Sequence, residues 1–196
     1  MKVIGLTGGT GSGKGVVSRS LEEAGAVIVD ADRIAHEIIE KGKPAYREII
    51  AYYGEDILDA EGDIIRKKLG EIVFHDAEKL AFLNQCTHKY IKQEIERQID
   101  AAKQAGTAKA VILDAPLLLE VGLESVCDAV WVVYAEPEVR AQRIMARDGI
   151  SHELALARIA NQKSWEEYRN AADLVIDNSG TIDALQAQLD ETLKNL

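Results

Sequence analysis

The residues GGTGSGKG, at positions 8–15, match the glycine-rich phosphate loop G-x-x-x-x-G-K-[ST] at every position but the last. Glycines let the backbone N–H groups of such a loop converge on phosphate oxygens, and the helix after the loop adds the positive end of its dipole. Lys14 would add a point charge beside the β- and γ-phosphates of a nucleoside triphosphate. We therefore predict that a nucleotide is bound by Gly8, Gly9, Thr10, Gly11, Ser12, Gly13, Lys14, Gly15 and Val16.

Gly15 stands where the pattern asks for a serine or threonine, whose hydroxyl would bind Mg²⁺, and Val16 does not replace that hydroxyl. Mg²⁺ usually keeps several waters, so a water can take the place of one missing ligand. We expect a functional metal site in spite of Gly15. A glycine-rich turn without a ligand is the alternative, and it is disfavoured because glycine otherwise weakens a structural element.

Three aspartates follow apolar runs that are typical of strands. Asp30 and Asp32 are two residues apart in VIVDADRIAH, so in an extended segment both would face the same side. A carboxylate near the γ-phosphate can orient an attacking hydroxyl, accept its proton or help to bind Mg²⁺. Asp114 ends the run AVILD, a pattern that often binds Mg²⁺ in phosphate-loop enzymes. Capping of the following helix is an alternative that stays open for Asp30 in particular.

Arg140, Arg143 and Arg147 fall within a sector of about 60° on a helix that turns 100° per residue. Arginines concentrated in this way could neutralise charge on a transferred phosphoryl group and exclude water, as the lid of a kinase does. We call Arg140, Arg143 and Arg147 the arginine stripe. A solvated helix face is the alternative explanation of this stripe.

The elements that position these residues are apolar strands separated by helices. Near-continuous apolar runs predict strands that are covered on both faces, hence a parallel sheet in an α/β layer fold. The predicted strands are 2–7, 26–30, 110–114, 129–135 and 174–177. Helical spacing is seen at 13–25 and 181–196, and two insertions rich in helical periodicity separate the second strand from the third and the fourth from the fifth.

Composition limits the function classes. The chain of 196 residues is 47% hydrophobic, and its net charge of -10 argues against nucleic acid or an anionic membrane as a partner. The cysteines Cys86 and Cys127 form no metal-binding or disulfide pattern and are expected to be buried thiols. No run approaches the ~20 apolar residues of a membrane span, and the first residues lack a signal-peptide pattern, so we expect a cytoplasmic protein.

Eight segments resemble, in order and spacing, the dephospho-coenzyme A kinase family over residues 1–180. They are IGLTGGTGSGKG, VIVDADRIAHEII, EGDIIRKKLGEIVF, THKYI, ILDAPLLLEVGL, QRIMARDG, ANQ and ADLVIDNSG. The resemblance implies an α/β P-loop kinase fold, with a five-stranded parallel sheet flanked by helices, a helical substrate-binding insertion and a lid. The implied domains are a nucleotide-binding core at 1–29, 108–139 and 172–196, a helical coenzyme A-binding domain at 30–107, and a lid at 140–171.

The same resemblance implies the reaction. The family transfers the γ-phosphoryl group of ATP to the 3'-hydroxyl of dephospho-coenzyme A, with Mg²⁺, in the last step of coenzyme A synthesis. By position, Asp32 would be the catalytic base, Lys14 and Arg143 would also be catalytic, and Asp32 and Asp114 would approach the metal, partly through water. Arg147, Asn178 and Gly180 would join the loop in binding ATP, and substrate binding would fall to Asp30, Asp32, Arg66, His88, Pro116, Leu117 and Leu118. We expect a monomer whose partner is the small-molecule substrate.

Three other functions remain to be weighed. Adenylate kinases also carry glycine after the loop lysine, in GKGT, but this chain has GKGV and lacks the contacts expected for a nucleoside monophosphate. A GTP-dependent switch needs N-K-x-D, which NQKS at 161–164 does not supply. A degenerate protein that binds nucleotide without turnover is the third alternative.

Overall fold

The computed structural model describes residues 1–194 and divides the chain into two compact units. One, which we call the core unit, comprises Met1–Val29 and the described residues from Ile99 onward. The other, the helical unit, is Asp30–Gln98. The sequence places this second boundary at residue 107, whereas the boundary between the compact units falls at Gln98, inside a long helix.

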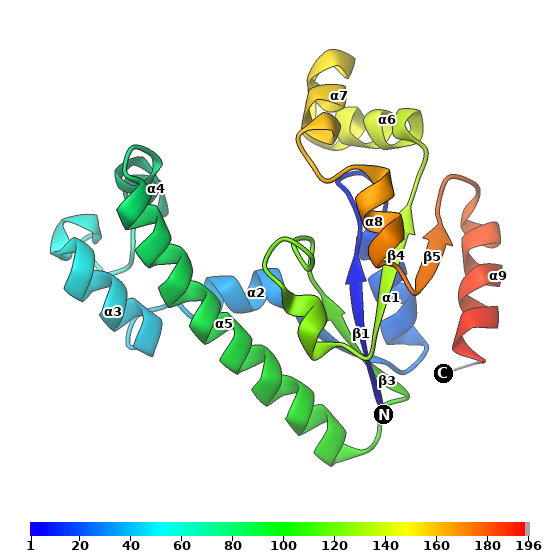
Figure 1. The fold of residues 1–196 in the computed structure, drawn as a ribbon, viewed down its shortest axis with the longest axis horizontal. Helices are drawn as coiled ribbons and strands as arrows, with labels where there is room; N and C mark the ends of the chain where they lie inside the picture. The colour runs from blue at the N-terminus through cyan, green and yellow to red at the C-terminus, as the bar shows by residue number, and fades with distance from the viewer. Residues whose placement is uncertain (195–196) are drawn as a thin grey trace. The chain divides into compact units, whose positions relative to one another are not determined.

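Five strands form one sheet, in the order β2-β3-β1-β4-β5 (Figure 1). Their bounds are Lys2–Thr7 (β1), Val27–Asp30 (β2), Ala110–Asp114 (β3), Ala129–Tyr134 (β4) and Leu174–Asp177 (β5). β1 pairs in parallel with β3 and β4, and β4 pairs in parallel with β5. The predicted α/β fold with a five-stranded parallel sheet is confirmed. Because β1 is the central strand, the loop that follows it lies in the middle of the carboxyl edge, where open α/β sheets bind ligands.

Two helices cover one face of this sheet, α1 (Lys14–Glu23) and α9 (Ile182–Leu193). Each buries leucine or valine side chains four residues apart, the spacing that places them on one helix face. Together with the sheet they form the main hydrophobic cluster of Ile4, Leu6, Val17, Leu21, Ala26, Ala110, Ile112, Trp131, Val133, Ile176, Leu185 and Leu189. This packing fixes the start of α1, and hence the end of the phosphate loop, against the sheet.

Three helices fill the segment between β4 and β5, namely α6 (Pro137–Asp148), α7 (His152–Ala160) and α8 (Trp165–Ala171). α6 begins with proline and ends at Gly149, whose φ of 66° lies in the left-handed region that favours glycine. α6 and α7 pack on each other through Ala141, Ile144 and Ala155. α8 begins with a capping box in which Ser164 and Glu167 satisfy each other's backbone N–H groups. We call residues 137–171 the lid segment.

The helical unit contains α2 (Ala31–Glu37), α3 (Pro44–Tyr53), α4 (Arg66–Phe74) and most of α5 (Ala77–Ala105), with a short 3-10 turn at Glu55–Ile57. α4 begins four residues later than GDIIRKKLGEIVF suggests, because Ile64 forms an antiparallel bridge with Leu58. None of the helices in residues 1–194 is both long and apolar enough to cross a bilayer.

Candidate functional site

A cavity of about 490 Å³ lies over the phosphate loop, entirely within the core unit. Its lining comes from the loop itself, from the turn after β3 and from the lid segment. The lining residues are Gly8, Gly9, Thr10, Gly11, Ser12, Gly13, Lys14, Gly15, Pro116, Arg143, Ile144, Arg147 and Gln162. The structure therefore brings together the predicted loop, one residue of the PLLLE segment and two of the three stripe arginines.

Two loop glycines adopt conformations that other residues rarely take. Gly11 has a φ of 77° and Gly13 a φ of 88°, and a Cβ atom at Gly13 would lie 2.0 Å from Nδ2 of Asn178. Gly13 is also the residue before α1, so it sets the direction in which the helix N-terminus points. Glycine is required here both by its dihedral angles and by the close approach of Asn178.

Gly13→Ala is expected to destabilise the loop by about 1–3 kcal/mol, because it combines an unfavourable dihedral angle with a steric clash. The measurable result is a lower thermal midpoint and weaker ATP binding by calorimetry. Gly70→Ala is the matched control, since Gly70 lies in α4 with nothing within 4 Å of an added Cβ. Wild-type ATP affinity in Gly13→Ala would contradict the described loop geometry.

Arginines of α6 hold the carbonyl groups of the loop. Nε of Arg140 donates to the Thr10 carbonyl at 2.9 Å. Nη1 of Arg143 donates to the Ser12 carbonyl at 3.2 Å and to the Gly11 carbonyl at 3.4 Å. Burial lowers the pKa of Arg140 from its usual range, although the residue stays protonated at neutral pH. Arg140 and Arg143 thus belong to the site and not to a solvated helix face.

Arg147 lies at the outer end of the stripe. Its guanidinium pairs with the carboxylate of Asp148, with Nε 2.7 Å from Oδ1, and this hydrogen bond raises the pKa of Arg147. Nη2 of Arg147 also lies 3.5 Å from Oγ1 of Thr10. Its side chain is 61% exposed, so it stands at the mouth of the cavity.

Asn178, at the end of β5, ties that strand to the loop. Its buried Nδ2 donates to the Ser12 carbonyl at 2.8 Å, and its own carbonyl accepts from Nη2 of Arg143 at 2.8 Å. Gly180 follows in the turn before α9 and does not line the loop cavity. The contacts of Asn178 orient the loop, and its part in binding ATP stays a prediction.

Lys14 is the first residue of α1 and its Nζ donates to Oδ1 of Asp114, the last residue of β3. The two side chains are 17% and 12% exposed. A lysine and an aspartate in such a setting each stabilise the charge of the other. The structure thus brings together the predicted phosphate-binding lysine and one of the two predicted metal-binding carboxylates.

The turn after β3 places its three predicted residues differently. Pro116 lines the loop cavity, and its carbonyl accepts from Oγ1 of Thr7 at 3.2 Å. Leu117 is 56% exposed. Leu118 is fully buried and lies against Gly5, so its side chain supports the turn and has no surface to offer a ligand.

The remaining predicted residues lie in the helical unit. Oδ1 of Asp30 accepts from the N–H of Arg33 at 2.9 Å, so Asp30 does cap α2, as its alternative role requires. Asp32 lies in the first turn of α2, and its backbone carbonyl is 2.7 Å from Nδ1 of His36. His88 is exposed on α5.

Arg66, the first residue of α4, lines a separate cavity of about 460 Å³ in the helical unit. The other lining residues are His36, Ile39, Glu40, Lys41, Asp63 and Ile64. The charged side chains of this lining are two bases, Arg66 and Lys41, and two acids, Glu40 and Asp63.

Gln162 is a site residue that the sequence reasoning did not assign. Its Oε1 accepts from the Thr10 N–H at 2.8 Å and from Nη2 of Arg140 at 2.9 Å. The segment ANQ belongs to the family resemblance, but a single glutamine in a turn carries no periodic or spacing signal. Only the folded lid segment shows that it reaches the loop.

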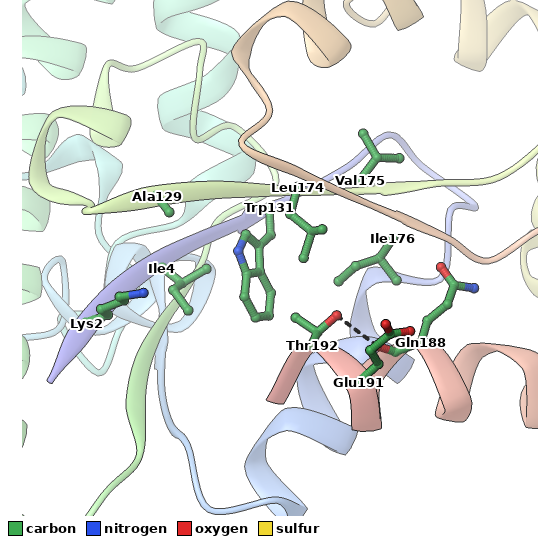
Figure 2. Close-up of a pocket in the computed structure, with 10 residues that line it drawn as sticks. All are labelled: Lys2, Ile4, Ala129, Trp131, Leu174, Val175, Ile176, Gln188, Glu191 and Thr192. Atoms are coloured by element: carbon green, nitrogen blue, oxygen red, sulfur yellow. Dashed lines mark hydrogen bonds between the residues drawn. The ribbon is translucent and has the colours of Figure 1, made fainter. Parts of the chain in front are cut away.

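Two other features have no part in this site. Burial raises the pKa of the thiols of Cys86 and Cys127, to about 11 and about 12, so neither is a nucleophilic thiolate at neutral pH. Cys86 is buried as expected, while Cys127 is only partly so. A cavity of about 450 Å³ lies between the sheet and α9, and its lining is largely apolar, with side chains such as Trp131 and Leu174 (Figure 2). It contains none of the predicted site residues.

Comparisons with known proteins show which family the chain resembles along nearly its whole length. A family model described as Dephospho-CoA kinase matches residues 2–184. A curated relative of that name from Carboxydothermus hydrogenoformans is 47% identical, over 96% of this chain and 91% of its own. Among solved structures, TT1252 from Thermus thermophilus has a TM-score of 0.82 at 32% identity, covering 100% of this chain and 97% of its own. Dephospho-CoA kinase from Campylobacter jejuni has a TM-score of 0.74 at 28% identity, covering 98% and 96%.

Proposed function

This chain belongs to the dephospho-coenzyme A kinase family, and we propose that it transfers the γ-phosphoryl group of ATP to the 3'-hydroxyl of dephospho-coenzyme A, giving coenzyme A and ADP. The observation that carries the proposal is the loop cavity, where Lys14 and the start of α1 adjoin arginines from the lid segment. Such an arrangement suits a triphosphate, because it combines backbone N–H groups, a helix N-terminus and positively charged side chains.

Phosphoryl transfer needs positioning and charge stabilisation more than covalent chemistry by the protein. Arg140, Arg143 and Asn178 hold the loop carbonyls from outside, which orients the peptide groups of residues 10–12. The hydroxyl of Ser12 is buried and has no hydrogen-bond partner among residues 1–194, so it is available to a phosphate oxygen. Lys14 then supplies charge to the phosphates, and Arg143 and Arg147 face the same cavity.

Asp32 is the proposed base. It follows the end of β2 by two residues and lies in the first turn of α2. A carboxylate that accepts the proton of the 3'-hydroxyl as the oxygen attacks phosphorus contributes about 10²–10⁴-fold to such reactions. Asp30, Arg66 and His88 are proposed to bind the acceptor, together with Pro116 and Leu117.

Mg²⁺ is proposed as the metal that accompanies ATP. Among residues 1–194 no group of three or more His, Cys, Asp or Glu side chains could hold a metal alone. A site with only one or two carboxylates fits Mg²⁺, which binds nucleotide kinases through such carboxylates, phosphate oxygens and water. Asp114, at the carboxyl end of β3, and Asp32 are the carboxylates proposed to hold it, partly through water. When bound, the ion would neutralise charge on the β- and γ-phosphates.

Gly15→Ser is expected to strengthen Mg²⁺ binding in the presence of a non-hydrolysable ATP analogue. An added Cβ at Gly15 has nothing within 4 Å, so the serine fits and restores the missing hydroxyl. One further ligand of this kind is worth about 1 kcal/mol, or about fivefold in affinity. Calorimetric titration with Mg²⁺ measures the change, with Gly70→Ser as the matched control. Loss of nucleotide binding in Gly15→Ser would contradict the proposed loop geometry.

An acceptor screen tests the proposed function. ADP release should be rapid with ATP and dephospho-coenzyme A together, and slow with ATP alone or with AMP as acceptor. Rapid release with AMP would indicate an adenylate kinase, and nucleotide binding without release under any acceptor would indicate a degenerate binding protein. We also propose a cytoplasmic monomer, which cell fractionation and analytical ultracentrifugation would test.

A further inference from the structure

Gln162 joins the lid segment to the phosphate loop. It lies between α7 and α8, and its backbone N–H donates to the Ile159 carbonyl at 3.2 Å, which anchors it to the end of α7. From that turn its side chain reaches the loop, where one oxygen, Oε1, accepts from Thr10 and from Arg140. The side chain also lines the loop cavity.

The three residues form a closed set of hydrogen bonds. Gln162 Oε1 accepts from the Thr10 N–H at 2.8 Å, Arg140 Nε donates to the Thr10 carbonyl at 2.9 Å, and Arg140 Nη2 donates to Gln162 Oε1 at 2.9 Å. Thr10 is therefore held at both its N–H and its carbonyl. The two side chains that hold it come from different parts of the lid segment.

Neighbouring residues are adapted to this contact. A Cβ at Gly9 would lie 2.3 Å from Nη2 of Arg140 and 3.0 Å from Oε1 of Gln162. A side chain at position 9 would therefore displace the guanidinium of Arg140 or the amide of Gln162. Burial lowers the pKa of Arg140, so the loss of a partner for its guanidinium would leave a partly buried charge with one hydrogen bond fewer.

We infer that Gln162 is a positioning residue for phosphoryl transfer. Its side chain fixes Thr10 and Arg140 relative to each other and so links the lid segment to the phosphate loop. The inference rests on the proposed function of this cavity. Gln162 acts through Thr10 and Arg140, and no contact of its own with the reacting atoms is required.

Gln162→Met keeps the length of the side chain and removes the acceptor. We expect kcat for coenzyme A formation to fall by about 10²-fold, the cost of a displacement of about 1 Å in a positioned site, with the KM for ATP close to wild type. The triphosphate contacts of Lys14 and of the α1 N-terminus do not pass through Gln162, which is why binding should survive.

Gln162→Glu should affect the two constants the other way round, with a larger effect on the KM for ATP than on kcat. The carboxylate keeps an acceptor oxygen for the Thr10 N–H and makes a stronger, charge-assisted bond to Arg140. It also adds a negative charge to the cavity that holds the triphosphate. We expect the KM for ATP to rise by about tenfold or more through like-charge repulsion, while kcat falls far less than in Gln162→Met.

Steady-state kinetics of both variants, with Gln186→Met as control, tests the inference. Gln186 is exposed on α9, where its side chain donates to Asp190, so its replacement should change neither constant. Wild-type kcat in Gln162→Met, or an equal loss of kcat in Gln162→Met and Gln162→Glu, would overturn the inference. Absence of coenzyme A formation by the wild-type chain would instead show that the proposed function is wrong.

Discussion

Replacing Asp32 with asparagine is expected to lower kcat for coenzyme A formation by about 10²–10⁴-fold. The substitution keeps the size and the polarity of the side chain, but the amide cannot accept the proton of the attacking 3'-hydroxyl. ATP binding should remain near wild type, because the loop, Lys14 and the lid arginines all lie in the core unit whereas Asp32 lies in the helical unit. Single-turnover product formation and ATP calorimetry measure the two effects separately.

Two controls accompany the Asp32 variant. Asp56→Asn removes an exposed carboxylate from the same unit and should leave kcat unchanged. Asp30→Asn alters the cap of α2, and since asparagine caps as well as aspartate, helix stability should hardly change. If Asp32→Asn weakened ATP binding as much as it lowered kcat, a structural role would replace the catalytic one.

Lys14→Met is expected to lower kcat/KM for ATP by about 10³-fold, at the upper end of the loss seen when one charge-stabilising donor is removed. Two effects combine. The phosphates lose a positive charge, and the carboxylate of Asp114, only 12% exposed, loses the partner that neutralises it. An unpaired carboxylate beside the triphosphate would repel it, so binding and turnover should both fall. Lys109→Met, an exposed lysine of the core unit, is the control.

The double variant Lys14→Met/Asp114→Asn separates these two effects. Removal of the unpaired charge should restore part of the ATP affinity, while turnover stays low because the phosphates still lack Lys14. The same ATP affinity in the single and the double variant would mean that Asp114 does not influence the triphosphate. In that case the contact between Lys14 and Asp114 would be a feature of packing alone.

The sheet was predictable because its strands are apolar runs with clear ends. The segment 110–114, for example, is bounded by Gly106 and by the turn at Pro116, and all five of its residues are buried. The loop was predictable because its chemistry needs glycines at fixed spacing, and two of them do have positive φ and no room for a Cβ. Local sequence carries both kinds of information.

The contacts across the lid segment were not predictable in the same way. The spacing of Arg140, Arg143 and Arg147 indicates one helix face, but it does not tell which backbone oxygens the guanidinium groups reach. Gln162 depends on how α7 and α8 bring a turn to Thr10, which is a tertiary property. Leu118 shows the opposite. It belongs to the PLLLE segment and is predicted to bind substrate, but its side chain is buried against Gly5.

The most direct test of the proposed function is the stoichiometry of its products. The purified chain is incubated with ATP, Mg²⁺ and dephospho-coenzyme A, and the products are separated and identified by mass spectrometry and phosphorus NMR. Coenzyme A phosphorylated at the 3'-oxygen should appear in an amount equal to the ADP formed. ADP without coenzyme A, or a phosphate on another oxygen of the acceptor, would contradict the account.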